Sequence, residues 1–282
     1  MTTRRDFIKN VSATTAFSLM FPEDFFSMNN KKHIGIQLYT IRKELEENFE
    51  GSLIKLANIG FNTVETAGYN DRKFYGYKPK YFKKYMNNLG LYAQSSHANV
   101  QLKNVDQIIE DTLEAGMDYL VKPSINGERR KSIDDYKRIA DEFNLIGERC
   151  MKSGLRFAYH NHAFEFEELE GQIPYNLLLE NTDSENLTMQ LDTYWMVYGG
   201  FQPVDYFKKY PGRFELFHIK DMDDSKKRES TEIGNGTIDF EEIFKVNKIS
   251  GMKYFFLEQE SFNMPVFKSL AISYNYLNNI LA

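Results

Sequence analysis

Short runs of β-type residues alternate with amphipathic helical patterns along most of the chain. From His33 onward we predict eight strands, whose centres recur about every 30 residues, which is the length of one βα unit. The predicted strands are His33–Leu38, Thr63–Glu65, Tyr92–Ser96, Tyr119–Lys122, Arg156–Asn161, Thr188–Asp192, Glu215–Lys220 and Tyr254–Gln259.

The segments between these strands carry apolar residues at helical spacing, most clearly at 49–59, 105–115 and 136–151. Gly60, Gly90 and Gly154 each stand between such a pattern and the next strand, where a glycine ends a helix. No Gly-x-Gly-x-x-Gly sequence follows the first strand, so the main sequence evidence for an open, dinucleotide-binding sheet is missing. We therefore predict the fold class α/β, as one (β/α)8 TIM barrel formed by residues 31–282.

Residues 1–30 differ from the rest of the chain. Arg4 and Arg5 precede Phe7-Ile8-Lys9 and a short apolar run, which resembles a twin-arginine export signal, although a clear cleavage site is missing. The run is too short to span a bilayer as a mature helix, so we expect no stable membrane insertion. The signal predicts an exported, periplasmic protein; the alternative is a basic tail on a cytoplasmic one.

Composition narrows the classes of partner. The chain has 282 residues and a formal net charge of −5, whereas a nucleic-acid partner requires a basic face, so we exclude nucleic acid. Its single cysteine, Cys150, excludes an internal disulfide and is predicted to be buried on a helix. The 23 Phe and 18 Tyr favour packing, with a possible stacking surface for a ring-shaped ligand. A homo-oligomer remains open.

Polar residues gather at the ends of the predicted strands. Four of the five histidines lie there, and so do several charged residues: His97, His160, His162 and His218, with Glu65, Lys122, Asp192, Lys220, Asp221, Glu258 and Glu260. In a (β/α)8 barrel all strands deliver their C-terminal ends to one mouth, where active sites lie. We therefore expect these side chains to share one pocket.

A mixed set of imidazoles and carboxylates points to a metal site. Such a set suits Mn, Zn, Co or Fe, whereas oxygen ligands alone favour Mg or Ca. Open coordination positions would let a substrate oxygen bind and be polarised. We predict one divalent metal ion (Mn, Zn, Co, Fe or Mg). The alternative is that Asp192 and Glu258 cap helices and that His218 belongs to the core.

Six segments carry a resemblance to a known family. They are Val64–Tyr69, His160–Phe166, Leu191-Asp192, His218–Asp221, Gly234–Phe240 and Leu257-Glu258. In order and spacing they resemble the sugar phosphate isomerase/epimerase family of xylose-isomerase-like TIM barrels, in the AP endonuclease 2 superfamily. The resemblance extends over residues 33–282 and identifies the superfamily better than the substrate.

The resemblance implies a Glu, Asp, His, Glu metal quartet on strands five to eight. Asp192, His218 and Glu258 match it, and His160 stands where ketose epimerases commonly have a glutamate. The metal ligands implied are His160, Asp192, His218 and Glu258. The catalytic residues implied are Glu258, His162 and Lys220; those expected to bind substrate are Glu65, His97, Lys122, Glu165 and Asp221.

The implied activity is that of a metal-dependent isomerase or epimerase acting on a sugar or keto-sugar through an enediolate-like proton transfer. A metal-bound imidazole is a poor base, so His160 weakens two-base epimerisation. A keto-sugar lyase or hydratase (dehydratase) on the same site is therefore an alternative.

Three further expectations concern ligands. An endonuclease IV-like enzyme needs three zinc ions, for which five histidines are few. A non-catalytic sugar-binding protein would not need a proton-transfer carboxylate. The loops after the last predicted strands contain no Arg cluster that could bind a phosphate group. Gly234-Asn235-Gly236 is interpreted as a turn before a helix at 238–245 and not as a phosphate-binding loop. We therefore expect a small, non-phosphorylated sugar.

Overall fold

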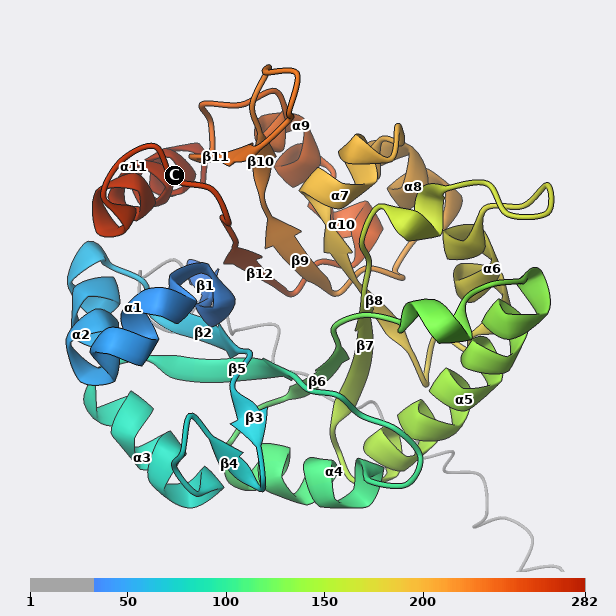
Figure 1. The fold of residues 1–282 in the computed structure, drawn as a ribbon, viewed down its shortest axis with the longest axis horizontal. Helices are drawn as coiled ribbons and strands as arrows, with labels where there is room; N and C mark the ends of the chain where they lie inside the picture. The colour runs from blue at the N-terminus through green and yellow to red at the C-terminus, as the bar shows by residue number, and fades with distance from the viewer. Residues whose placement is uncertain (1–32, 282) are drawn as a thin grey trace, which may run out of the picture. The chain divides into compact units, whose positions relative to one another are not determined.

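The computed structural model describes residues 33–281, in which eight parallel strands close into a barrel (Figure 1). Neighbouring strands follow the order β1-β12-β9-β8-β7-β6-β5-β2. Their bounds are β1 Gly35–Gln37, β2 Thr63–Thr66, β5 Tyr92–His97, β6 Tyr119–Lys122, β7 Arg156–His160, β8 Thr188–Asp192, β9 Leu216–Ile219 and β12 Tyr254–Leu257. The predicted (β/α)8 fold is confirmed. The predicted export signal lies outside the described residues.

Helices surround the barrel in Figure 1. They are α1 Arg42–Glu47, α2 Phe49–Ile59, α3 Pro79–Asn88, α4 Val105–Glu114, α5 Ile133–Lys152, α6 Pro174–Asn181, α7 Thr193–Tyr198, α8 Pro203–Lys209, α9 Phe240–Lys245, α10 Asn247–Ser250 and α11 Val266–Ile280. Short 3-10 turns span Leu38–Ile41, Gly127–Arg129 and Phe164–Phe166. The predicted helices therefore correspond to α2, α4, α5 and α9, and Cys150 is buried on α5 as expected.

Two small hairpins lie in the loops that follow barrel strands. One pairs β3 (Tyr69–Asn70) with β4 (Lys73–Phe74), and the other pairs β10 (Asp221–Met222) with β11 (Ser230–Thr231). Strands of two residues leave no hydrophobic period to detect, so the sequence pattern did not predict them. The last predicted strands were also too long, because pairing in β12 ends at Leu257.

The barrel strands bury both of their faces, in two separate apolar clusters. A small cluster contains Tyr119, Val121, Ala158, Leu216 and Phe256. Their chain neighbours Leu120, Phe157 and Phe217 belong to the large cluster that the helices also join. Because successive strand side chains point to opposite faces, the small cluster fills the barrel interior and the large one separates strands from helices.

An ionic network lies at the N-terminal ends of the strands. Glu215, just before β9, contacts Arg156 Nη2 at 3.0 Å and Lys253 Nζ at 3.2 Å. The Tyr119 hydroxyl donates to the same carboxylate at 2.8 Å. Together with the small apolar cluster, this network fills the bottom of the barrel. The C-terminal end is therefore the place for a ligand cavity.

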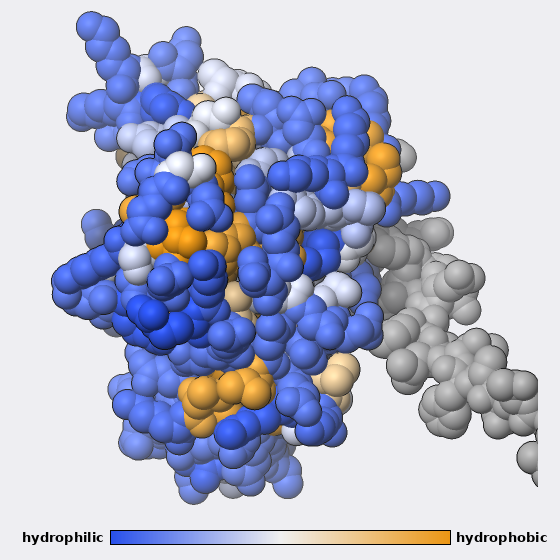
Figure 2. Space-filling model, turned by 90° about the vertical axis from the view of Figure 1, so that its right-hand side faces the viewer, coloured by the Kyte–Doolittle hydropathy of each residue, from blue (hydrophilic) through white to orange (hydrophobic). Residues whose placement is uncertain are grey.

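The outer surface is polar where α5 lies. Figure 2, which views the molecule from the side of α5 and α6, shows a mostly hydrophilic face with separate hydrophobic areas. On α5, Leu145 and Met151 are exposed single residues. None of the described helices combines the length and the apolar composition that crossing a bilayer requires.

Close packing of α5 yields a stability prediction. A Cβ added at Gly147 would lie 2.0 Å from the carbonyl oxygen of Asn186, in the segment that leads into β8. Although Ala normally favours a helix, this overlap forces the backbone to shift, so Gly147→Ala should lower the free energy of unfolding by about 1–3 kcal/mol. Urea denaturation measures this. The control Leu145→Ala, exposed on the same helix, should change it by less than about 0.5 kcal/mol. A stabilised Gly147→Ala protein would contradict the close contact.

Candidate metal centre

Four ligand-type side chains converge at the C-terminal end of the barrel interior. His160 and His218 lie two residues beyond members of the small apolar cluster on β7 and β9, so strand alternation turns them inward as well. Asp192 ends β8, and Glu258 directly follows β12. One ligand atom from each residue lies within 4.8 Å of the others, and all four residues are buried. The structure thus brings together the four residues predicted to bind metal.

Individual distances define this cluster. His218 Nδ1 lies 3.1 Å from Glu258 Oε2 and 3.9 Å from Asp192 Oδ2. His160 Nε2 lies 4.0 Å from the same Asp192 oxygen. Two imidazoles and two carboxylates therefore face a common point, as a divalent transition metal requires.

Unsatisfied polar atoms in the cluster test whether a metal fits. Among the described residues, Asp192 Oδ2 and His160 Nδ1 are buried and lack a hydrogen-bond partner. Burying the Asp192 oxygen unpaired costs free energy, which a bound cation would recover. Burial raises the pKa of Asp192 to about 7, against the opposing charge of Lys220. The residues present fit a divalent ion, and their role as ligands stays a prediction.

Asp192 is also a helix cap, which was the alternative interpretation of this residue. Its Oδ1 accepts a hydrogen bond from the backbone N–H of Trp195 at 2.9 Å, which caps the start of α7. The other oxygen, Oδ2, faces the cluster. The cap uses one carboxylate oxygen and leaves the other directed at the cluster, so the two interpretations of Asp192 are compatible.

Glu65 lies inside the barrel and holds His218. Its Oε1 is 2.5 Å from His218 Nε2, and Gln37, Ser95 and Gln190 also donate to its carboxylate at 2.6–2.7 Å. Burial alone would raise the pKa of Glu65, but the histidines His97 and His218 lower it well below its usual value. With Nε2–H donating to Glu65, the loss of the Nδ1 proton makes His218 Nδ1 available to a metal ion.

A buried ammonium borders the cluster. Lys220 Nζ lies 3.4 Å from Glu258 Oε2 and 4.0 Å from Asp192 Oδ2, and it donates to Glu260. Burial would lower its pKa, but the charges of Glu258, Asp192 and Glu260 raise it well above the usual value. The same ammonium lies 5.0 Å from the centre of the Trp195 ring. Lys220 is therefore a fixed positive charge at the cluster.

His162 is held at the mouth by the loop after β7. The backbone N–H of His162 donates to Glu165 Oε2 at 2.9 Å, and the Tyr159 hydroxyl donates to Glu165 Oε1. Burial lowers the pKa of His162 to about 4, helped by the charge of Lys220, so the imidazole is neutral at pH 7. Burial raises the pKa of Glu165 to about 8. Glu165 thus positions His162 through the backbone.

A cavity of about 460 Å³ opens above the cluster. Its lining includes His97, His160, His162, Glu258 and Glu260, together with Tyr39, Ala67, Tyr69, Ala98, Asn99, Pro123, Ser124 and Trp195. His97, His160 and His218 also bring ring nitrogens within 4.8 Å of one another. Because this group shares two members with the first cluster, we assign both to one site.

Four residues expected to bind substrate do not line this cavity. Glu65 lies beneath His218, and Glu165 anchors the loop that carries His162. Lys122 Nζ donates to Asn99 Oδ1 at 2.8 Å and to the Val100 carbonyl, which ties down the loop after β5. The fourth is Asp221. All four have supporting contacts with protein groups, which strand position alone did not reveal.

Asp221 closes the loop that contains Gly234 and Gly236. Its carboxylate accepts backbone N–H groups of Met222, Gly234, Gly236 and Ile238 at 2.8–3.1 Å. A Cβ at Gly236 would lie 2.3 Å from Asp221 Oδ1, which explains the glycine. The amides of this loop are therefore occupied by a side chain of the protein, in agreement with its interpretation as a turn.

Several cavity residues received no predicted role because they lie outside the eight barrel strands. Tyr69 belongs to the β3–β4 hairpin, where its hydroxyl donates to Asp111 at 2.7 Å. Trp195 follows Asp192 by three residues, and the helix-cap pattern at Asp192 was the available signal. Glu260 was noticed at a strand end but received no role, since its partner Lys220 comes from another strand.

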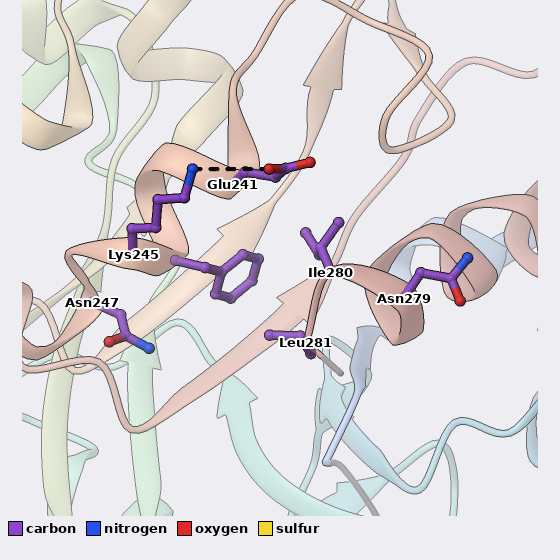
Figure 3. A pocket seen from close by; sticks show the side chains of 7 residues that line it. Glu241, Lys245, Asn247, Asn279, Ile280 and Leu281 are labelled. Carbon is purple, nitrogen blue, oxygen red and sulfur yellow. Dashed lines mark ion pairs between the residues drawn. The ribbon is translucent and has the colours of Figure 1, made fainter.

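A second cavity, of about 450 Å³, lies between α9, α10 and the end of α11 (Figure 3). The Glu241–Lys245 ion pair of 3.9 Å borders it, with Phe244, Ile280 and Leu281. The C-terminal ends of barrel helices lie at the bottom of the barrel, away from the metal cluster. The cavity contains no ligand set, and we assign no chemistry to it.

Comparisons with known proteins agree with this geometry. Residues 53–273 match a family model described as xylose isomerase-like TIM barrel. Over 140 residues, 44% of the chain, it is 28% identical to an inosose dehydratase of Clostridium perfringens, of which the match covers 46%. The chain thus spans about half the length of this curated relative.

Solved structures extend the similarity to nearly the whole barrel. A sugar phosphate isomerase/epimerase of Parabacteroides distasonis is 29% identical, with a TM-score of 0.78 over 89% of this chain and 95% of that one. A second protein of that name from the same organism is 28% identical, with a TM-score of 0.76 over 88% and 98%. The resemblance stated from the six sequence segments is confirmed.

The contacts of Asp221 predict a structural role. Asp221→Asn turns an NH2 group toward backbone donors, so it should lower the free energy of unfolding by about 2–4 kcal/mol while metal stoichiometry is unchanged. Denaturation and metal analysis measure the two effects. Asp239→Asn is the matched control, because Asn caps α9 as well as Asp does. Loss of metal without loss of stability would contradict the anchoring role.

Protonation of the cluster predicts a pH dependence of metal affinity. Burial would lower the pKa of His218, but Glu258 and Glu65 raise it to about 10, and burial raises the pKa of Asp192 to about 7. Metal binding needs both groups deprotonated, so affinity should rise up to about tenfold per pH unit between pH 7 and 10. Calorimetry in buffers of different ionisation enthalpy should detect about one released proton near pH 8. Affinity independent of pH would contradict the assignment.

Proposed function

Because the chain belongs to the family of xylose isomerase-like TIM barrels, we propose that it is a metal-dependent enzyme that transfers a proton beside the carbonyl group of a sugar or keto-sugar. The observation that carries this proposal is the convergence of His160, Asp192, His218 and Glu258 at the floor of the cavity. These four residues would hold the ion. When bound, a divalent ion supplies a Lewis acid that polarises a substrate oxygen and acidifies the neighbouring C–H group.

Glu258 is the proposed proton acceptor. It lines the cavity, and its Oε2 contacts His218 and Lys220 at 3.1 and 3.4 Å. Burial would raise its pKa, but the positive charges of Lys220 and His218 lower it well below the usual value. Glu258 is therefore ionised at neutral pH, which is the form that can accept a proton from carbon.

Lys220 and His162 are the proposed positive charge and hydrogen-bond donor beside the substrate oxygens. Lys220 lies just behind the cavity lining and remains protonated because three carboxylates surround it, so its charge favours negative charge that develops on a substrate oxygen. His162 is neutral at pH 7 and lines the cavity, so one ring nitrogen can donate while the other accepts. His97 lines the same cavity and is expected to contact a hydroxyl group.

Dehydration is the second candidate reaction, and the distribution of bases favours it over epimerisation. The carboxylates that line the cavity, Glu258 and Glu260, both follow β12, whereas imidazoles come from β5 and β7. Epimerisation needs a base on each face of the substrate. In an elimination, Glu258 removes the C–H proton and, once protonated, returns it to the departing hydroxyl, which leaves as water. The name of the Clostridium perfringens relative, inosose dehydratase, supports this candidate.

Two substitutions test the proposal. Asp192→Asn keeps the helix cap but removes the ligand charge, and it should lose most of the bound metal and the activity. Glu258→Gln should lower turnover by about 10²–10⁴-fold, since it cannot accept the proton. The probes are inosose, D-fructose and D-glucose in D2O with Mn²⁺, where NMR detects C–H exchange and ultraviolet absorbance detects dehydration. Asp141→Asn, exposed on α5, is the control and should retain activity.

The outcomes separate the alternatives. Exchange of a C–H proton without loss of water identifies an isomerase or epimerase, and formation of a dehydrated ketone identifies a dehydratase. Saturable binding of these probes without exchange or dehydration would refute the enzymatic proposal in favour of a sugar-binding protein. Three bound metal ions per chain would refute it in favour of an endonuclease IV-like site.

A further inference from the structure

We propose that the barrel mouth selects an uncharged sugar or cyclitol ring, which stacks on Trp195, and that Glu260 disfavours phosphorylated analogues. The inference rests on the proposed function and names its substrate class. Neither residue is one of the four candidate metal ligands. Both line the cavity.

The charges at the mouth oppose an anionic ligand. Within the described residues, the cavity lining contains the carboxylates Glu258 and Glu260 but no lysine or arginine. Lys220, just behind this lining, is already contacted by Asp192, Glu258 and Glu260. Three carboxylates balance one ammonium and one divalent ion. No surplus positive charge is left for a phosphate group.

Other groups that bind phosphate in proteins are engaged in this chain. The amides of Gly234 and Gly236 donate to Asp221, so the glycine loop does not present them to a ligand. Lys122 donates to Asn99 and Val100. The Arg130 guanidinium lies over the Phe164 ring, 3.4 Å from its centre. The loops after β6 and β9 therefore use these cations and amides for internal contacts.

Trp195 offers a fixed aromatic surface. Its backbone N–H is bound by Asp192, and its ring packs edgewise on Tyr194 and Tyr198, with centroids 4.7 and 5.7 Å away. Aromatic faces carry partial negative charge, and the C–H groups on one face of a sugar ring carry partial positive charge. An uncharged ring can therefore pack on the indole while its hydroxyl groups reach the polar lining.

Trp195 and Glu260 flank the same ammonium. Lys220 Nζ lies 5.0 Å from the Trp195 ring centre and is bound by Glu260. A ring that packs on Trp195 therefore places its substituents near the Glu260 carboxylate, whose side chain is 37% exposed. A hydroxyl there can donate to Glu260, whereas a phosphate is repelled.

The experiment uses the fact that Trp195 is the chain's single tryptophan, so tryptophan fluorescence reports on this cavity. Zn²⁺-loaded full-length protein, freed of excess metal, is titrated with D-fructose, D-fructose 6-phosphate, myo-inositol and myo-inositol 1-phosphate. We expect saturable changes with a neutral compound and a dissociation constant at least about tenfold higher for its phosphate. Equal or tighter binding of the phosphates, or no change with any probe, would overturn the inference.

Variants assign the effect to the two residues. Glu260→Gln should reduce the discrimination against phosphate by about tenfold, because the amide carries no charge that repels it. Glu229→Gln, an exposed carboxylate after β10, is the control. By calorimetry, Trp195→Ala should weaken neutral binding by about tenfold, and Trp195→Phe should restore most of it. Unchanged discrimination in Glu260→Gln, or unchanged neutral binding in Trp195→Ala, contradicts the assignment. Tyr81→Ala, 65% exposed, should have no effect.

Metal analysis and C–H exchange on the same samples distinguish this inference from the proposed function. Preferred binding of phosphates by a protein that holds one metal and exchanges protons overturns the inference alone. Neutral binding on Trp195 without metal or chemistry supports the inference and overturns the enzymatic proposal.

Discussion

Inside the barrel, the Glu65 carboxylate accepts hydrogen bonds from side chains of β1, β5 and β8 and contacts His218 of β9 at 2.5 Å. A carboxylate without exposure is tolerated only when such donors surround it, so five strands must keep their register for this contact to exist. The contact fixes the ring of His218 and leaves its Nδ1 facing Asp192 and Glu258. The geometry of the metal cluster therefore depends on a residue that does not line the cavity.

Sequence patterns predicted at which end of the barrel a residue lies, but not which other residues its side chain contacts. Strand ends placed His160, Asp192, His218 and Glu258 at one mouth, and the structure brings them together. The same reasoning expected Glu65 and Asp221 to bind substrate, and neither lines the cavity. A strand end does not reveal whether a side chain meets solvent, backbone amides or another strand. The position of Trp195 in the cavity was not predicted, because it depends on the helix cap at Asp192. The two-residue hairpin strands carried no periodic signal.

The site combines two environments with different chemical roles. Below lies a closed network of hydrogen bonds around Glu65, and above it lies a cavity whose lining carries imidazoles, carboxylates and aromatic rings. His160 contributes an imidazole where the resembled epimerases commonly have a carboxylate, so both carboxylates of the cavity lining, Glu258 and Glu260, follow one strand, β12. Such a one-sided arrangement suits reactions with a single base better than inversion at a carbon that must be reached from both faces.

The ionic plug formed by Glu215, Arg156 and Lys253 at the bottom of the barrel has a kinetic consequence. With that end filled, molecules can reach and leave the cluster only through the mouth. Arrival of a new molecule and departure of the old one then use a single passage and exclude each other. Under the proposed function, a product molecule that stays in the cavity competes with the substrate for the same site. Slow release of product therefore limits the turnover rate, most strongly at high product concentration.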